Sequence, residues 1–398
     1  MTDELHVDWD PRSDPVQSNQ IAAYDEMRSR CPVAYSRYRN WTVFRHEDVV
    51  RILDDHHTFS NRVSAHLSVP NGMDPPEHTP FRAINDKYFT ADRMSAFAPE
   101  CREVARQLVA GSADGQIEVM SALAEPFANH IQCRFMGWPE RLHEPLQQWT
   151  HKNRAATRAL DREAMSAIAV EFDSYIREQL DERRTVEAGA PTDVTSELLS
   201  ERVDGRPLSD TELVSLIRNW TVGELSTIAS CVGILVSFLA AHPEIQHRLR
   251  TEPDLIGPAS DEILRMHAPL VANRRRTTRE VTVAGRRIPA GERVMVLWAS
   301  ANRDETIFGN PDEFRLDRDP ADNLLYGRGI HNCPGAPLAR LELTIFLEEL
   351  LAATDSVEPV TGTEPAYAAY PAGGFEAVPA VAVSRSSRPP NRSGGAED

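Results

Sequence analysis

One long, mostly apolar run constrains the fold of this chain more than any other feature. It follows the capping box Ser209-Asp-Thr-Glu212 and continues without proline to Ala241, where His242-Pro243 ends it. A helix of about 30 residues is about 45 Å long, enough to cross a whole domain. Because the run is apolar on most sides, the helix has to be buried. The sequence therefore predicts a mainly helical fold with a smaller β part, built around one long central helix.

The middle of this predicted helix breaks the apolar pattern. Gly223-Glu-Leu-Ser-Thr227 places Glu224, Ser226 and Thr227 where the rest of the run is hydrophobic. The hydroxyls of Ser226 and Thr227 could bond back to the preceding turn and simply bend the helix. The residues by themselves leave open whether this segment has a chemical role.

A second distinctive stretch is Tyr326–Arg340, YGRGIHNCPGAPLAR. Gly327, Gly329 and Gly335 permit tight turns and a close approach to a flat ligand. Cys333 precedes a predicted helix, where backbone N–H groups and the helix dipole favour its thiolate. Such a cysteine could be a metal ligand, a nucleophile or an inert buried thiol. Zinc is disfavoured, because no second pair of ligands has the usual spacing.

The whole string resembles the haem-binding signature of the haem-thiolate monooxygenases, the cytochromes P450, written F-G-x-G-x-H-x-C-x-G. The positions in register are Gly327, Gly329, His331, Cys333 and Gly335. Tyr326 replaces the usual Phe, which keeps the ring but adds a hydroxyl that needs a partner or water. The resemblance implies haem b as the cofactor, Cys333 as the axial ligand of its iron, and a haem site that includes Tyr326, Gly327, His331 and Gly335.

Two further segments resemble the parts of this family that bind the haem propionates. In MDPPEHTPFR, His78 and Arg82 lie four residues apart and share one helix face, which suits two carboxylates. Arg275 is the expected propionate arginine by its register in the sequence. It is flanked by Arg274 and Arg276, so the assignment depends on a single position.

Glu262-Ile-Leu-Arg265 resembles the family motif E-x-x-R, and Arg318 supplies its usual third member. On its own, a Glu–Arg pair three residues apart would be an ordinary surface ion pair of little value. The resemblance implies a buried structural triad, which is costly to break because one charge is then left unpaired.

The central helix departs from the family pattern A-G-x-D/E-T. Thr227 falls on the family threonine, whereas Ser226 stands where an acid is usual and Glu224 where a glycine is usual. The resemblance implies that this helix faces the haem and delivers protons. Either Glu224 takes over this role, or water and Ser226 serve instead.

The resemblance covers about residues 21–384. We expect an N-terminal arm at 1–16, a single cytochrome P450 domain at 17–384 and a flexible tail at 385–398. Local patterns predict helices at 21–30 and 46–54, a strand at 41–44, an irregular segment at 59–76, mostly helix from 96 to 187 with a loop at 183–191, and a hairpin-like sheet between 273 and 297.

Composition and net charge limit which kinds of partner and which cellular compartment we expect. A net charge of −17 argues against nucleic acid. The five scattered cysteines are typical of a reducing compartment. We find no signal pattern and no run of ~18 or more uninterrupted apolar residues. The sequence therefore predicts a cytoplasmic monomer without membrane attachment.

The resemblance implies a monooxygenase that inserts one atom of O2 into a small organic substrate, by hydroxylation or oxidative dealkylation. We expect the electrons to come from a separate ferredoxin and its NAD(P)H-dependent reductase, and the substrate to be selected by residues 59–76 and 155–187. The candidate docking residues for an acidic ferredoxin are Arg93, Arg102, Arg328 and Arg340. Two alternatives are a peroxide-driven peroxygenase of the same fold and a haem-binding sensor without turnover.

Overall fold

The long helix expected from the sequence lies at the centre of the structure. In this computed structural model, which describes residues 6–185 and 193–385, α10 spans Asp210–Ala241. The side chains of Ser209 and Glu212 form both halves of the capping box. The helix is long and apolar enough to cross a membrane, contrary to our reading of its composition, but 72% of its most apolar window is buried inside the molecule. It is the core helix of the fold.

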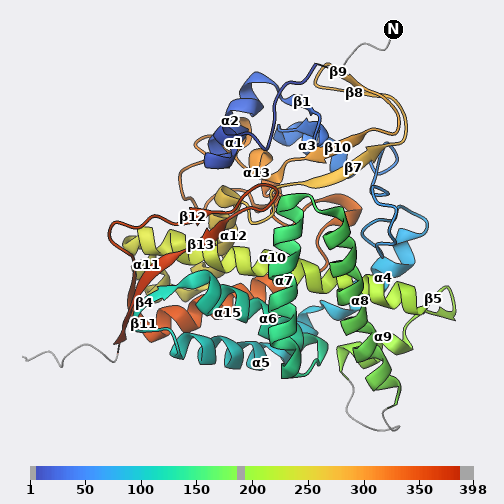
Figure 1. Cartoon of the computed structure of the whole chain (residues 1–398). Coiled ribbons are helices and arrows are strands. Elements are labelled where there is room, and N and C mark those ends of the chain that lie inside the picture. The colour runs from blue at the N-terminus through green and yellow to red at the C-terminus, as the bar shows by residue number, and fades with distance from the viewer. Residues whose placement is uncertain (1–5, 186–192, 386–398) are drawn as a thin grey trace, which may run out of the picture.

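Helices surround α10 in the lower part of Figure 1. The longer ones are α2 (Gln20–Arg30), α3 (His46–Asp54), α4 (His78–Tyr88), α5 (Ala91–Ala110), α6 (Glu125–Met136), α7 (His143–Ala159), α8 (Arg162–Arg184), α9 (Val194–Ser200), α11 (Pro243–Thr251), α12 (Ile256–His267) and α15 (Ala336–Ala353). The shorter turns are α1 (Asp14–Ser18), α13 (Trp298–Ala301), α14 (Glu305–Phe308), η1 (Met120–Ala124), η2 (Glu140–Leu142), η3 (Pro253–Leu255), η4 (Pro320–Asp322) and η5 (Gly329–His331). Helices α6, α8, α12 and α15 pack on α10, and α5 packs along α15.

The helix predictions at 21–30 and 46–54 agree with α2 and α3 within one residue. The loop predicted at 183–191 starts later than expected, because α8 continues through Arg184. There the guanidinium of Arg183 binds the carboxylate of Asp193 and the carbonyl of Gln179, which holds the last turn of the helix. Residues 186–192 of that predicted loop lie outside the described residues.

A five-stranded sheet forms the other end of the molecule, at the top of Figure 1. Its strand order is β1 (Val33–Ser36), β2 (Asn40–Val43), β10 (Arg293–Val296), β7 (Asn273–Thr277) and β3 (Phe59–Ser60). Only the β2–β10 pair within this sheet is parallel. The hairpin β8 (Val281–Val283) and β9 (Arg286–Ile288) lies between β7 and β10 in the chain, as the alternating valines predict.

A second sheet contains a strand that the sequence analysis missed. It has the order β11 (Thr354–Pro359), β14 (Pro379–Ser384) and β4 (Gly115–Glu118). Strand β4 lies inside the stretch predicted to be mostly helical, and it pairs Ile117 with the distant Ala380. Four residues are too few to show a period, so this strand exists because of its partner. The remaining short strands are β5 (Arg202–Val203), β6 (Arg206–Pro207), β12 (Ala366–Tyr367) and β13 (Phe375–Ala377).

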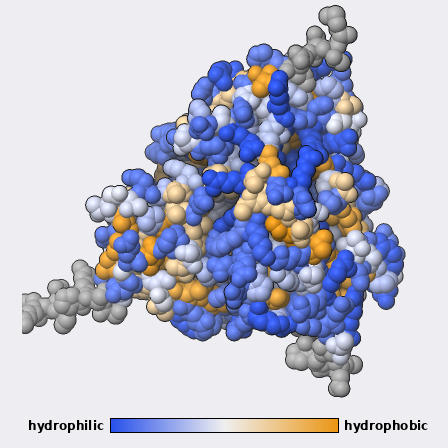
Figure 2. Space-filling view, in the orientation of Figure 1, coloured by the Kyte–Doolittle hydropathy of each residue, from blue (hydrophilic) through white to orange (hydrophobic). Residues whose placement is uncertain are grey.

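The N-terminal segment packs against the five-stranded sheet where it is described. The Trp9 ring is buried, with its centroid 5.2 Å from that of Phe44, and the Asp8 carboxylate accepts the Tyr35 N–H at 2.7 Å. The tail predicted at 385–398 lies beyond the described residues except for Arg385. The face in Figure 2 is mostly hydrophilic, with hydrophobic residues in small scattered groups.

Candidate active site

The segment Tyr326–Gly335, called here the cysteine loop, is shaped by glycines at two of the three expected positions. Gly327 and Gly329 both have φ near +72°, a backbone conformation that other residues resist. A Cβ on Gly329 would also lie 2.5 Å from the carbonyl oxygen of Leu53 on α3. Gly335 differs from the expectation, because its φ is −81° and it caps α15 without strain. Its Cβ would meet the Cys333 sulfur at an ordinary 3.9 Å.

The Cys333 thiol lies just ahead of α15 and remains accessible. Enclosure by protein atoms raises the pKa of this thiol, although the backbone N–H groups of Gly335 and Ala336 act in the opposite direction. The backbone N–H groups at the start of α15 therefore favour the thiolate as expected, while burial has the larger and opposite effect on the pKa. A coordinated metal would deprotonate such a thiol.

Tyr326 has a partner for the hydroxyl that distinguishes it from the family's Phe. Its Oη donates to Asp261 Oδ1 at 3.3 Å, and the Arg340 guanidinium carbon lies 4.4 Å from its ring centroid. Arg340 in turn donates to Asp261 Oδ2 at 3.0 Å. The hydroxyl that Tyr326 adds therefore links the cysteine loop to α12 by a hydrogen bond.

Three basic side chains gather beside this loop, and among the described residues no carboxylate forms a hydrogen bond or ion pair with them. The rings of His78, at the start of α4, and His331, in the cysteine loop, have centroids 4.5 Å apart, and both Nε2 atoms are buried without a hydrogen-bond partner. Arg275 on β7 is 3% exposed, and its guanidinium donates only to the carbonyl of Arg274. Strand alternation turns the flanking arginines outward, so Arg275 is the inward one.

The pKa values of this cluster are lowered chiefly by burial and, for the two histidines, also by neighbouring basic groups. Burial, then His78 and Arg275, lower the pKa of His331 to about 3. Burial and Arg82 lower the pKa of His78, and burial lowers that of Arg275 to about 10. Three buried basic groups without carboxylate partners fit a ligand that brings two carboxylates, as a haem does with its propionates.

Arg82, which the sequence predicts to bind a propionate, lies beside the cluster and also contacts the cysteine loop. Its Nη1 donates to the carbonyls of Asn332 at 2.5 Å and Ile330 at 3.3 Å, while its Nε donates to Asp86. It therefore braces the cysteine loop against α4 while lying beside the cluster.

The polar centre of α10 divides its side chains between two directions. Ser226 is exposed, and its Oγ donates back to the carbonyl of Val222 at 2.8 Å, so the local hydrogen bond considered from the sequence exists at this residue. Thr227 is half-buried, and a Cβ on Gly223 would have no atom within 4 Å. Glu224 points into the core instead, toward Glu342 on α15.

Glu342 is a residue that the sequence analysis missed. It is 0% exposed, and burial together with Glu224 raises its pKa well above the ordinary range. Burial raises the pKa of Glu224 to about 7. The sequence carried one signal for it, an acid within the apolar face of the helix that follows Cys333.

The expected triad is assembled in the structure. Arg265 donates two hydrogen bonds to Glu262, from Nε at 2.7 Å and from Nη2 at 2.9 Å, and Arg318 Nε donates to the same carboxylate at 2.9 Å. Arg265 is fully buried, and its Nη1 reaches the carbonyl of Asn302 at 2.6 Å.

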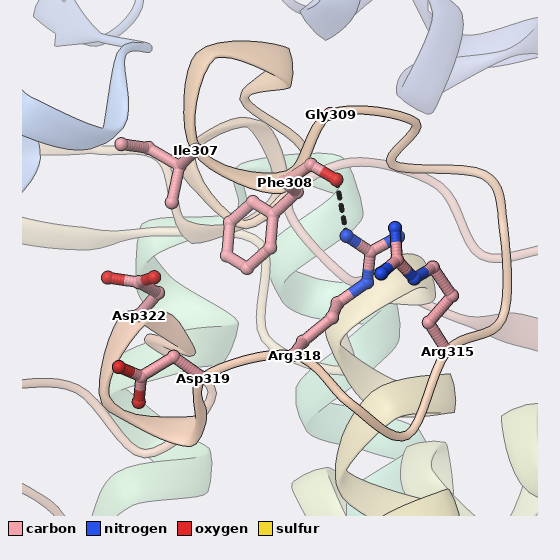
Figure 3. A pocket seen from close by; sticks show the side chains of 7 residues that line it. All are labelled: Ile307, Phe308, Gly309, Arg315, Arg318, Asp319 and Asp322. Atoms are coloured by element: carbon pink, nitrogen blue, oxygen red, sulfur yellow. Dashed lines mark hydrogen bonds between the residues drawn. The ribbon is translucent and has the colours of Figure 1, made fainter.

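A surface pocket of about 310 Å³ is lined in part by Arg318, one member of this triad (Figure 3). The guanidinium groups of Arg315 and Arg318 lie on one side of the Phe308 ring, and the carboxylates of Asp319 and Asp322 lie on the other. The Arg318 guanidinium donates hydrogen bonds to main-chain carbonyls, including that of Phe308. This pocket therefore belongs to the structural network and contains none of the residues expected to touch a haem.

All four candidate docking arginines already have acidic partners. The pairs are Arg93–Glu197, Arg102–Glu348 and Arg102–Glu349, Arg328–Asp54, and Arg340–Asp261. A docking partner would have to compete with these acids for the guanidinium groups.

The cysteine loop, the basic cluster and the long helix α10 form a site that fits a haem. The sequence profile described as cytochrome P450 matches residues 146–365. The chain belongs to the cytochrome P450 family, as one of its bacterial monooxygenases.

Two curated relatives match most of the chain. It is 33% identical to the erythromycin C-12 hydroxylase of Saccharopolyspora erythraea over 85% of this chain and 88% of that protein. It is 31% identical to the cyclomarin C epoxidase of Salinispora arenicola over 85% of this chain and 89% of that protein.

Among solved structures, a mutant of P450 EryK in complex with erythromycin B is similar with a TM-score of 0.85. That pair is 30% identical and covers 94% of this chain and 98% of the other. CYP109E1 from Bacillus megaterium in complex with corticosterone is similar with a TM-score of 0.82, at 26% identity over 93% and 100% of the two chains.

Proposed function

We propose that this cytochrome P450 uses haem b to insert one atom of O2 into a small organic substrate, by hydroxylation or oxidative dealkylation. Its electrons come from a separate ferredoxin and an NAD(P)H-dependent reductase, and it works as a cytoplasmic monomer. The named relatives act as a hydroxylase and an epoxidase, which is the same reaction class.

The observation that carries the proposal is the cluster of His78, His331 and Arg275 beside the accessible Cys333. Two buried Nε2 atoms and a buried guanidinium lack acidic partners there, which is costly unless a ligand satisfies them. In this assignment His78, Arg275 and His331 bind the propionates, and Cys333 Sγ binds the iron. Gly327, Gly335 and Tyr326 shape the loop, and Arg82 braces it.

The haem, held through a thiolate, supplies the reduction and cleavage of dioxygen. The protein supplies protons, orientation and exclusion of water. Thr227 holds a water or substrate oxygen by its hydroxyl, and Glu224 is the acid on the same helix. Ser226 is committed to the Val222 carbonyl, which favours Glu224 over Ser226 as the proton source.

The substrate would lie between α10 and the segment 59–76. That segment is fastened to α10, because Val69 N–H donates to Ser215 Oγ at 2.9 Å and Asn219 Nδ2 donates to the Val69 carbonyl at 2.9 Å. Helices α7 and α8 supply the other wall, as the resemblance implies. The substrate is then chosen by the shape of these walls.

Two measurements test the proposal. The reduced carbon monoxide adduct should show the red-shifted Soret band of thiolate ligation, and a Cys333→Ala protein should lose it. Retention of the band would contradict the assignment of Cys333.

Turnover then separates the alternatives, starting from small molecules that shift the spectrum of the purified protein. A ferredoxin, its reductase and NADPH should give an oxygenated product with one atom from labelled O2. Product with peroxide alone and none with the redox partners would indicate a peroxygenase, and no product under either condition would indicate a sensor.

A further inference from the structure

Three exposed arginines gather on one face of the five-stranded sheet. Arg274 and Arg276 are two residues apart on β7, so their side chains point to the same face. Arg293 on β10 lies directly opposite Arg276 in the antiparallel register, and directly opposite residues share a face. Like charges in this arrangement repel each other and destabilise the pair of strands. The sheet therefore keeps a local positive charge that its own folding does not favour.

A fourth arginine, Arg39 in the turn between β1 and β2, adds to this charge. The parallel register of β2 and β10 brings Arg293 beside Asn40, the residue that follows Arg39. Burial, then Arg39 and Arg293, lowers the pKa of Arg274, as expected for guanidinium groups near one another. The four residues Arg39, Arg274, Arg276 and Arg293 are called here the sheet arginines.

Two tyrosine rings hold the guanidinium of Arg39. Its Cζ lies 4.4 Å from the ring centroid of Tyr38 and 5.4 Å from that of Tyr370, and its Nη2 donates to Tyr38 Oη at 3.2 Å. Its Nε is buried and has no hydrogen-bond partner among the described residues. A buried donor of this kind is costly unless a ligand or a water satisfies it. The protein thus fixes the direction of Arg39 without supplying an acidic partner.

None of the sheet arginines has an Asp or Glu partner within the described part of the chain. Arg276 Nε donates to a main-chain carbonyl at 3.1 Å, and Arg293 Nη2 donates to the carbonyl of Val63 at 3.5 Å. Glu292, which precedes Arg293, accepts a hydrogen bond from Asn40 Nδ2 at 3.3 Å instead. Acids are not scarce, since the chain has 60 Asp and Glu against 43 Lys and Arg. Four unpaired arginines in so acidic a chain indicate a site for an anionic ligand.

The sheet arginines lie where the sheet meets the walls that we assign to the substrate. Arg293 contacts the main chain of the segment 59–76. Arg12 links the β1–β2 turn to the end of α7, because its Cζ lies 5.3 Å from the Tyr38 ring centroid and its Nη2 donates to the carbonyl of Arg158 at 3.4 Å. In Figure 1, β7 passes above the ends of α7 and α8 that face the sheet.

The segment between β12 and β13 connects this site to the central helix. Tyr370, whose ring contacts Arg39, lies three residues before Gly373, and three residues span at most about 11 Å. The carbonyl of Gly373 accepts a hydrogen bond from Ser230 Oγ on α10 at 2.8 Å. Ser230 lies one helical turn after Thr227. An organic molecule of ordinary size can therefore contact the sheet arginines at one end and approach the centre of α10 at the other.

We propose that the sheet arginines bind the carboxylate of the substrate, which is therefore an organic acid. This inference rests on the proposed function and names its substrate class. A guanidinium binds a carboxylate through two parallel N–H···O bonds, and the rings of Tyr38 and Tyr370 supply an apolar wall for the adjoining carbon atoms. The site is separate from the haem propionates, because Arg275 points to the opposite face of β7.

The first test measures binding to the ferric holoenzyme without turnover. Dodecanoate, 4-phenylbutyrate and 2-naphthylacetate are each compared with their methyl esters, by the shift of the Soret band and by the rise in melting temperature. At least one acid should bind about 10-fold more tightly than its ester, which lacks the charge. Arg274→Gln and Arg293→Gln should abolish this preference, and Arg287→Gln should keep it, because Arg287 is exposed on β9 and paired with Glu280. Equal affinity of acid and ester in all three pairs would overturn the proposal.

A second measurement does not depend on which acid is used. Arg276→Gln and Arg293→Gln each remove one of two opposed charges, so both should raise the denaturant midpoint of the holoenzyme without ligand. A lower midpoint in both variants would mean that the fold itself requires these arginines, which would contradict the proposal.

Two other occupants of the site are outcomes of the same experiments. If inorganic phosphate at equal concentration raises the melting temperature as much as the acids do, through the same arginines, the site takes an inorganic anion and the substrate assignment fails. If the variants slow reduction by an acidic ferredoxin but bind acids as the parent does, the sheet arginines dock a protein and the assignment also fails. Both results leave the monooxygenase proposal intact. Absence of turnover with the redox partners and a bound acid would instead refute the proposed function, while the preference for acid over ester would still stand.

Discussion

On strand β7, the side chain of Arg275 points in the opposite direction to those of its two neighbours in sequence. Successive side chains of a strand point to opposite faces, so Arg275 is buried while Arg274 and Arg276 face outward. The same selection by direction operates on α10, where Ser226 is exposed and Glu224 is buried. At this scale, function depends on side-chain direction more than on residue type.

Arg275→Ala should weaken haem retention, whereas Arg274→Ala should not. A charge-assisted hydrogen bond contributes about 1.5–3 kcal/mol, so the loss of Arg275 should weaken haem affinity about 10- to 100-fold. The measurement is haem transfer to an acceptor protein, followed by the Soret absorbance. Equal rates of transfer from the two variants would show that Arg275 does not hold a propionate.

Thr227→Ala should uncouple the reaction without preventing substrate binding. The hydroxyl orders the proton carrier, but a hydroxyl is itself no proton source at neutral pH. NADPH consumption should therefore continue while most of its electrons appear as hydrogen peroxide. Thr227→Ser keeps the hydroxyl and should retain coupling, and a coupled Thr227→Ala enzyme would exclude the threonine from proton delivery.

At the scale of elements, packing between helices brings together charged residues that are far apart in the sequence. The Glu262–Arg265 pair lies within α12, but Arg318 comes from the segment after α14, and its guanidinium also binds the carbonyl of Phe308 at the end of α14. The contact between α10 and α15 likewise places Glu224 against Glu342. Both groups are buried by packing between elements, and their energetics follow from that burial.

Arg318→Ala should destabilise the protein by about 1.5–3 kcal/mol, because Glu262 loses one charge-assisted hydrogen bond while it keeps both from Arg265. Arg315→Ala is the control, since its pair with Asp317 is exposed and should contribute at most about 1 kcal/mol. Denaturant titration and the haem content after purification provide the measurements. A variant of Arg318 with normal haem content and only slower turnover would assign it a catalytic role.

The α10–α15 carboxyl pair should make the protein less stable as the pH rises. The pKa of Glu224 is raised from 4.5 to about 7, so between these values the folded state holds a proton that the unfolded chain releases. The contribution of this proton to the free energy of unfolding is fully present below pH 4.5. It is lost as the pH rises to about 7, a decrease of about 3 kcal/mol. The Glu224→Gln, Glu342→Gln double variant should have a nearly flat profile in that window, measured by denaturant midpoints. A parallel fall in parent and variant would show that other groups cause it.

At the scale of the whole molecule, charge governs the encounter with a redox partner. The chain carries a net charge of −17, so an acidic ferredoxin is repelled at long range. Attraction has to be local, at arginines such as Arg328 in the cysteine loop and Arg102 on α5, and these are already paired. Docking on this face is therefore expected to be weak and sensitive to salt.

Electron transfer from an acidic ferredoxin should slow as ionic strength rises, because salt screens contacts between exposed charges. Arg102→Glu should lower the rate at low salt by about 10-fold and flatten the salt dependence. Arg158→Glu, on α7, is the control and should leave both unchanged. Stopped-flow reduction of the haem measures the rate, and indifference to salt in the parent would exclude docking through these arginines.

Local spacing alone determined much of this protein. Residues close together in the chain determine three features, so the sequence predicts them directly. These are the capping box and the end of α10, the cysteine loop with its two left-handed glycines, and the spacing of Glu262 and Arg265. Tertiary structure decided what depends on distant partners and burial. Strand β4 exists through its pairing with β14, and Glu224 and Glu342 meet because α10 packs against α15. Burial also raises the pKa of Cys333 against the effect of the backbone N–H groups, because desolvation depends on all the atoms that surround a group and not on its neighbours in sequence.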